Sequence, residues 1–237
     1  LIDTEKSKVV SKIMQVNIEH GIEGAKVAVS RNDYIIIVDT IRASTTYVNA
    51  FAKGAVRIVP CSSREHLEKK MKLYPGALRS GERLCKKIEG YDLGSSPEEM
   101  SKSDLTGKTI LSSTTNGSRM VVASSKSSLV VMGSFCNSSA VVDFLKAKSQ
   151  NISIICSGRL GEEVIEDTLC AEYLEHKFSN SSKKFHMTSK EIEAECQSSP
   201  SYEMLTTAGL QNDFKFCMEI DSHDLVPVLD GDGFILI

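Results

Sequence analysis

One short stretch of the chain, YIIIVDTIRASTT at residues 34–46, joins chemically active side chains to an element that can position them. Apolar and β-branched residues run into Asp39, Arg42 follows three positions later, and hydroxyl side chains come next at 44–46. A carboxylate at the edge of a buried strand needs a cation or a metal ion beside it. Free amides where a helix starts favour phosphate or carboxylate groups. The stretch therefore predicts a site for a small anion.

Other apolar segments also end in small or charged residues, and this repetition predicts where the site lies. The polar ends are Gly81-Glu82-Arg83, Thr114-Thr115-Asn116-Gly117, Gly133-Ser134 and Cys156-Ser157-Gly158. In open α/β sheets, ligands bind outside the carboxyl ends of the strands. We therefore expect these ends to converge with Asp39 on one cleft.

Several acids in these segments could hold a hard cation. The candidates are Asp39, Glu82, Asp92, Glu166 and Asp167. Mg²⁺ prefers oxygen ligands and retains waters, whereas the five scattered histidines argue against a transition-metal site. Glu166 and Asp167 are adjacent in a predicted helix and face about 100° apart. We therefore expect at most one of these two to point squarely into the cleft.

Simpler explanations exist for most of these residues taken singly. Ser44, Asn116 and Asn137 could be helix N-caps, and Gly81, Gly117 and Gly158 could be turn glycines. Arg42 and Glu82 could form an ordinary ion pair. Asp39 is harder to explain in this way, and separate explanations do not account for acids and bases gathering at the same strand ends.

The apolar periodicity predicts the elements that must position these side chains. Short continuous apolar runs, typical of strands covered on both faces, occur at 35–38, 56–60, 109–111, 129–133 and 152–156. Helical spacing between them occurs at 44–53, 64–74, 137–148 and 166–178. Alternating strands and helices predict an α/β fold, a three-layer α/β/α sandwich with a largely parallel, mixed sheet.

The C-terminal third differs in composition from the rest. Residues 179–189 are rich in Ser and Lys, which predicts an exposed connector, and helices are expected at 188–197 and 201–217 before a last strand at 233–237. The length of 237 residues fits a single domain over 1–237, with two intimately packed subdomains as the alternative.

Bulk composition excludes several classes of partner. The net charge of −3 provides no field that would recruit nucleic acid or an anionic membrane. No apolar run approaches the roughly 20 residues that span a bilayer, and the N-terminus has no apolar signal core. Seven cysteines without CxxC pairs indicate reduced thiols in a cytoplasm. Dimerisation is common for α/β enzymes of this size, and a homodimer is left open.

The motifs VDTIRASTT, SGER, GYDLGSSP, TTNGS, GSFCNSSAV and CSG followed by ED and CA occur here in a fixed order. In this order the chain resembles the 2-phosphosulfolactate phosphatase (ComB-like) family over roughly residues 30–175. The resemblance implies an Mg²⁺-dependent phosphomonoesterase that hydrolyses (2R)-2-phospho-3-sulfolactate to 3-sulfolactate and phosphate, in coenzyme M biosynthesis or related sulfonate metabolism. It also implies a distinctive α/β/α fold.

The resemblance carries over residue by residue. The matching positions are Asp39, Arg42, Ser44, Thr45, Thr46, Gly81, Glu82, Arg83, Asp92, Gly94, Thr114, Thr115, Asn116, Gly117, Ser134, Asn137, Cys156, Gly158, Glu166 and Asp167. The chain departs from the usual pattern at Tyr91, Ser95, Ser118 and Ser157, where Phe, Asn, Thr and Ala are usual. These small changes bear on substrate preference more than on reaction type.

Roles follow as expectations. Asp39, Arg42, Glu82 and Asp167 are expected to be catalytic, and Asp39, Glu82, Asp92, Glu166 and Asp167 are the candidate Mg²⁺ ligands. The small anionic substrate, a phosphorylated 2-hydroxy acid, is expected at Arg42, Ser44, Thr45, Thr46, Arg83, Thr115, Asn116, Gly117, Ser134, Asn137, Cys156 and Gly158.

Several alternatives stay open at this point. Asp39 either binds the metal while water attacks phosphorus, or acts as a nucleophile, although the second Asp of a DxD phosphatase is missing. Cys156 fits a packing role better than a phosphocysteine, because no C-x5-R loop lowers its pKa. The function could also be a phosphatase of another phosphorylated 2-hydroxy acid, or a non-catalytic binder of an organic anion.

Overall fold

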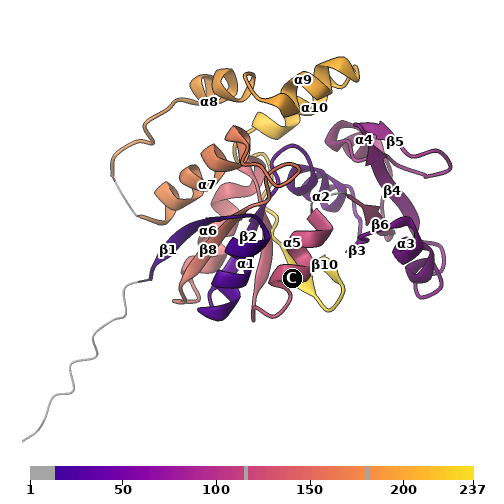
Figure 1. Cartoon of the computed structure of the whole chain (residues 1–237), viewed down its shortest axis with the longest axis horizontal. Coiled ribbons are helices and arrows are strands. Elements are labelled where there is room, and N and C mark those ends of the chain that lie inside the picture. Colours follow the sequence, from indigo (N-terminus) through magenta and orange to yellow (C-terminus); the bar gives the residue numbers. More distant parts are fainter. Residues whose placement is uncertain (1–13, 115–116, 180–181) are drawn as a thin grey trace, which may run out of the picture.

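The frame of the molecule is one mixed ten-stranded sheet in the order β1-β8-β2-β7-β9-β10-β3-β6-β4-β5 (Figure 1). The computed structural model describes residues 14–114, 117–179 and 182–237. The strands are β1 (Val16–His20), β2 (Tyr34–Val38), β3 (Arg57–Pro60), β4 (Leu78–Arg83), β5 (Lys86–Lys87), β6 (Thr109–Ser113), β7 (Val130–Gly133), β8 (Ile152–Cys156), β9 (Pro227–Asp230) and β10 (Gly233–Leu236).

Helices alternate with the strands through most of the chain. They are α1 (Gly21–Ser30), α2 (Ala43–Ala52), α3 (Arg64–Met71), α4 (Pro97–Lys102), α5 (Gly117–Ser124), the 3-10 turn η1 (Phe135–Asn137), α6 (Ser138–Lys146), α7 (Ile165–Phe178), α8 (Ser189–Cys196), α9 (Pro200–Thr207) and α10 (Gln211–Met218). Among the described residues, no helix is both long and apolar enough to span a bilayer.

Strand β2 shows why the sheet must be covered on both faces. Its side chains alternate, and both sets are buried. Ile36 and Val38 belong to one core that also holds side chains of α6 and α7. Ile35 and Ile37 belong to a second core, which holds side chains of α1, α2 and α5. The predicted three-layer α/β/α sandwich with a largely parallel, mixed sheet is therefore confirmed.

Two parallel blocks of strands, β1-β8-β2-β7 and β3-β6-β4, are joined through the β9-β10 hairpin. The hairpin is antiparallel to β7 on one side and to β3 on the other, so the two blocks run formally in opposite directions. Each step across a sheet turns the strand by about 20–25°, and five steps separate β2 from β6. This twist reduces the reversal between the two blocks, and residues from strand ends of both blocks line one cavity.

The last three helices form a separate cover at one side of the sheet (Figure 1). Helix α8 contacts α7, and α10 contacts both α4 and η1. Residues 182–188, which precede α8, are exposed or half-buried, in the region predicted as a connector. This cover reaches the strand ends of the first block, where the polar residues gather.

Candidate active site

A cavity of about 190 Å³ lies where strand ends of both blocks meet. Its walls come from the segments after β2, β4, β6 and β8 and from α7 and α9. They are Asp39, Ile41, Arg42, Ala43, Glu82, Leu84, Cys85, Ser95, Thr114, Gly158, Arg159, Leu160, Val164, Glu166, Asp167, Ser201, Met204 and Leu205. The predicted ends of β2, β4, β6 and β8 therefore converge, whereas the predicted Gly133-Ser134 end does not line the cavity. The cavity has a size that suits a small molecule.

Asp39 is fixed at this cavity by the turn that leads from β2 into α2. Its backbone N–H donates to Ser44 Oγ at 2.9 Å, and the Ala43 N–H donates to its Oδ1 at 3.1 Å. The carboxylate thus accepts a hydrogen bond from one of the free backbone amides at the start of α2, where a negative charge is favoured. The side chain is nearly buried, with only 8% of the residue exposed.

Glu166 and Asp167 both border the cavity from the first turn of α7. We expected at most one of them to point squarely into the cleft, and the two carboxylates do differ in their contacts. Asp167 accepts the Thr40 N–H at 2.8 Å and the Gly158 N–H at 3.0 Å. It thereby ties together the segments that follow β2 and β8. Both carboxylate oxygens of Glu166 are buried without a hydrogen-bond partner.

The crowding of acids changes their protonation. Burial raises the pKa of Asp39 to about 6, and the nearby charges of Glu166 and Glu82 add to the rise against the Ala43 amide and Arg42. Burial, together with the charges of Asp39 and Glu166, also raises the pKa of Asp167 well above its usual value. The metal-free site therefore holds negative charge at an energetic cost.

Arg42 lines the same cavity, but its charge is already partnered. Its Nη1 lies 2.5 Å from Asp213 Oδ2, and both residues are buried. Nη2 donates to the Cys85 carbonyl at 3.5 Å. Asp213, from α10, also accepts the Ser96 hydroxyl at 2.5 Å. The ion pair considered for Arg42 and Glu82 is therefore made with Asp213 instead, and the remaining guanidinium N–H groups are available to a ligand.

The hydroxyl residues of α2 stabilise the fold and do not line the cavity. Ser44 Oγ bonds the Asp39 backbone, and Thr45 Oγ1 donates to the Thr40 carbonyl at 3.0 Å and lies 2.8 Å from Ser134 Oγ. Thr46 Oγ1 donates to the Ser95 carbonyl at 3.2 Å. The first turn of α2 thus uses its hydroxyls internally, because buried hydroxyls must find partners.

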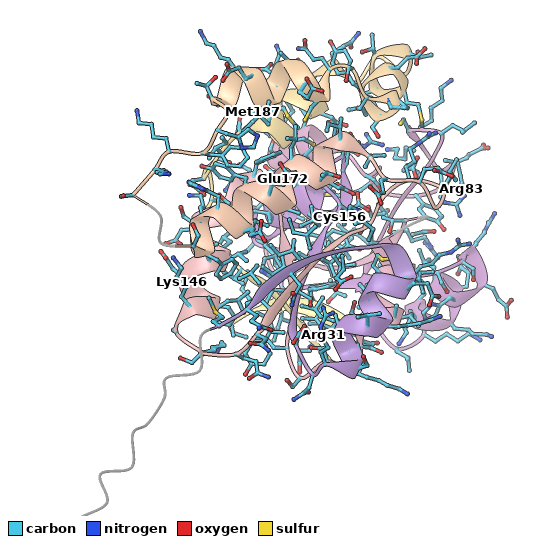
Figure 2. The ribbon with its side chains drawn as sticks, turned by 60° about the vertical axis from the view of Figure 1, so that its left-hand side comes forward. Arg31, Arg83, Lys146, Cys156, Glu172 and Met187 are labelled. Carbon is cyan, nitrogen blue, oxygen red and sulfur yellow. The ribbon has the colours of Figure 1, made fainter. Side chains whose placement is uncertain are left out.

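Four other predicted site residues lie away from the cavity walls. Ser134 and Asn137 form a capping box at η1, with Ser134 N–H donating to Asn137 Oδ1 at 2.9 Å. Asp92 is exposed and accepts the Arg79 N–H. Arg83 extends from the edge of the molecule (Figure 2), and its guanidinium donates to the Glu82 carbonyl.

Cys156 is buried in the interior beneath α7 (Figure 2). Its thiol bonds the Asp167 carbonyl at 3.5 Å, and burial raises its pKa. This environment suits packing and not nucleophilic attack. Thr115 and Asn116 lie outside the described residues, and Gly117 begins α5.

Gly158 is required by the geometry of the cavity wall. Its φ of 63° is in the left-handed region, and a Cβ there would lie 2.4 Å from the Glu162 carbonyl oxygen. We expect Gly158→Ala to lower the free energy of unfolding by about 1–3 kcal/mol and to displace the amide that Asp167 accepts. Urea unfolding and phosphate release would measure the two effects.

Gly161→Ala is the matched control for this prediction. Gly161 lies in the same loop with a φ of 91°, yet nothing stands within 4 Å of a Cβ added there. Its substitution should carry the backbone strain without the collision. Equal losses of activity in the two variants would contradict the importance of the Gly158 contact.

The sequence did not single out several residues of the wall. The C-terminal helices, for which no motif was recognised, supply the α9 wall residues Ser201, Met204 and Leu205. They also supply Asp213, which is not part of the wall and pairs with Arg42. Arg159 follows a predicted strand end directly, and that position was the one available signal for it. Leu84 and Leu160 border the cavity on exposed turns.

The oxygen donors at the cavity are of the kind that a hard cation needs. No group of three or more His, Cys, Asp or Glu in the described ranges forms a preformed metal cluster. Mg²⁺ does not require one, because it is usually bound through one or two carboxylates while keeping waters and substrate oxygens. The unpartnered Glu166 carboxylate and the adjacent Asp39 suit such a cation, and the buried Ser95 hydroxyl is also without a partner. The residues therefore fit Mg²⁺.

The chain matches a family of known proteins over most of its length. The family model described as 2-phosphosulpholactate phosphatase matches residues 22–232 of the chain. The chain belongs to the 2-phosphosulpholactate phosphatase family. The family predicted from the ordered motifs is thus confirmed, and its name denotes hydrolysis of a phosphoric monoester.

Relatives that carry the family name match the chain over most of their length. A probable 2-phosphosulfolactate phosphatase of Thermotoga maritima is 33% identical over 211 residues, which are 85% of this chain and 91% of that protein. The probable 2-phosphosulfolactate phosphatase of Clostridium acetobutylicum is 30% identical over 210 residues, 83% of this chain and 89% of that protein. A third, from Caldicellulosiruptor saccharolyticus, is 30% identical over 216 residues.

Proposed function

We propose that the chain hydrolyses (2R)-2-phospho-3-sulfolactate to 3-sulfolactate and phosphate with the help of Mg²⁺, in coenzyme M biosynthesis or related sulfonate metabolism. Membership of the family supports the reaction class. The observation that carries the proposal is the cavity in which Asp39, Glu82, Glu166 and Asp167 stand beside Arg42 and Arg159. A site that only bound an organic anion would gain nothing from these acids.

The charges of the site support a divalent cation. Four carboxylates face two guanidinium groups, and Asp213 already partners Arg42. The proposed substrate carries close to four negative charges near neutral pH, because a phosphomonoester contributes almost two. Such a substrate would be repelled by the protein alone. Glu166 and Asp39 are the residues that would hold Mg²⁺, with Glu82 beside them.

Each residue then has a distinct part in the reaction. Bound Mg²⁺ would neutralise the carboxylates and polarise the phosphoryl oxygens. Arg42, held by Asp213, keeps N–H donors for the phosphoryl group, whose charge is stabilised in phosphoryl transfer by positioned cations. Asp167 fixes the two strand-end segments through the Thr40 and Gly158 amides, so its part is positioning.

Two roles remain for Asp39 itself. Either Asp39 holds Mg²⁺ while water attacks phosphorus, or one of its carboxylate oxygens attacks phosphorus itself. Rapid-quench trapping of phosphate on Asp39, or a stable beryllofluoride adduct, would establish the nucleophile. Repeated failure of both would leave water as the attacking group.

Phosphate release from racemic 2-phosphosulfolactate tests the function and its metal. We expect release of about half of the total phosphate with Mg²⁺, because one enantiomer is used, and a loss of at least about a hundredfold in rate with EDTA. Restoration by added Mg²⁺ is the control. Release from 2-phospholactate but not from the sulfonate would assign another phosphorylated 2-hydroxy acid. No release from either compound would contradict the enzyme function.

The compartment is part of the proposal. All seven cysteines are free thiols, and six of them are buried. This state fits the reducing cytoplasm, where the small anionic substrate would also be found.

A further inference from the structure

Arg159 differs from the other cations around the cavity because its charge has no acidic partner. Its side chain lines the cavity and is half-buried, and no ion pair forms between it and any acid of the described chain. Arg42 is committed to Asp213. In an adjoining depression, Lys87 and Lys102 lie 3.7 and 2.7 Å from Glu99 and Glu98. Within the part of the chain that the structure describes, Arg159 is therefore the cation of the cavity whose charge is not balanced by an acid. A bound anion can pair with it.

The backbone around Arg159 is held in place. Its N–H donates to the Glu162 carbonyl at 2.8 Å, and the Glu162 N–H donates back at 2.9 Å. The preceding Gly158 N–H donates to Asp167 Oδ2. The loop is thereby fixed relative to the acids of the site, so the guanidinium extends from a preorganised base.

Arg159 belongs to the rim of the cavity, whereas the acids lie at its base. Asp39, Glu166 and Asp167 are buried, but Leu160, next to Arg159, is 72% exposed. Across the rim, Leu84 is 81% exposed and precedes Cys85. Burial raises the pKa of the Cys85 thiol, and the charges of Arg42 and Arg159 both oppose this rise. Arg159, Leu84 and Cys85 all line the cavity, and the Arg159 charge acts on Cys85.

We propose that Arg159 binds the acid group of the substrate that is not hydrolysed and so selects phosphomonoesters that carry a second strong anion. This inference rests on the proposed function. The buried acids draw the metal and the phosphoryl group to the base, which leaves the sulfonate and carboxylate nearer the rim. A guanidinium fork matches the oxygens of either group.

The test is the kinetics of Arg159→Gln with 2-phosphosulfolactate and Mg²⁺. A charge-assisted hydrogen bond contributes about 1.5–3 kcal/mol, so we expect KM to rise about 10–100-fold while kcat falls less than about threefold. Arg159→Lys, which keeps the charge and loses the fork, should give an intermediate KM. Arg64→Gln, an exposed arginine on α3 with the same change of charge, is the control and should behave as the native chain does.

Inhibition by the two products assigns the contact. Arg159→Gln should weaken inhibition by 3-sulfolactate about 10–100-fold and inhibition by inorganic phosphate less than about threefold. Lactate as a third inhibitor separates the groups: weakened lactate inhibition assigns the carboxylate, and unchanged lactate inhibition assigns the sulfonate. An unchanged KM, or equal weakening of phosphate inhibition, would overturn the proposal. An inactive native chain would instead contradict the proposed function.

Discussion

Replacing Asp39 with asparagine should abolish phosphate release and, in the metal-free protein at pH 7, raise the free energy of unfolding. The loss of rate should reach at least about a thousandfold, as for a central group of a catalytic unit. The gain in stability follows from the crowding of acids at the cavity. Asparagine removes a buried charge, and its Oδ1 can still accept the Ala43 N–H.

The pH dependence of this gain has a definite sign. The Asp39 carboxyl group has a pKa of about 6 in the folded chain, above its ordinary value of 3.8. A raised carboxyl pKa means that the folded state binds more protons than the unfolded state between these values, so stability falls as the pH rises through this window. At pH 7 the full penalty is present, about 1–3 kcal/mol. The advantage of Asp39→Asn should shrink towards pH 4.

Thermal and urea unfolding at pH 4.5 and 7, with EDTA and with Mg²⁺, would measure the effect. Mg²⁺ should stabilise the native chain more than the variant, because binding to the folded state adds stability by mass action. Asp104→Asn is the control, since the pKa of this exposed carboxyl is lowered by hydrogen bonds from Thr106. A variant less stable than the native chain at pH 7 would contradict the cost assigned to the Asp39 charge.

Local patterns in the sequence predicted the elements that frame the site. Strand β2 and its neighbours β7 and β8 are continuous apolar runs. Such a run is the pattern that a strand covered on both faces shows in the sequence. Helix α4 also begins on a local signal, because Ser96 accepts the Glu99 N–H and Pro97 follows at the first helical position. Strand β1, helix α1 and strand β9 were not predicted, because their short segments mix polar and apolar residues.

The roles of individual side chains depended on contacts that no local pattern contains. Thr45 meets Ser134 across 89 positions, and this pairing removes both hydroxyls from the cavity. Asp167 meets Thr40 across 127 positions and acts on backbone amides. A motif identifies which residues gather, whereas the tertiary fold decides which of them face the ligand and which support those that do.

The contact between Arg42 and Asp213 leads to the largest expected change in stability. Asp213→Ala should lower the free energy of unfolding by about 3–5 kcal/mol, because it leaves the buried guanidinium of Arg42 without its counter-charge. Phosphate release should also fall, since Arg42 loses the group that orients it towards the cavity. Urea unfolding would measure the first effect. Lys69→Ala, which breaks the exposed pair with Glu65, is the control and should cost less than about 0.5 kcal/mol.

A double substitution separates the fold from the reaction. Replacing both partners with apolar residues, Arg42→Met with Asp213→Leu, removes the unpaired charge and should recover most of the stability lost in Asp213→Ala. Phosphate release should stay low, because the cavity has lost the guanidinium that we propose for the phosphoryl group. An active double variant would exclude Arg42 from the reaction. An Asp213→Ala variant within about 1 kcal/mol of the native chain would show that water, and not Asp213, satisfies Arg42.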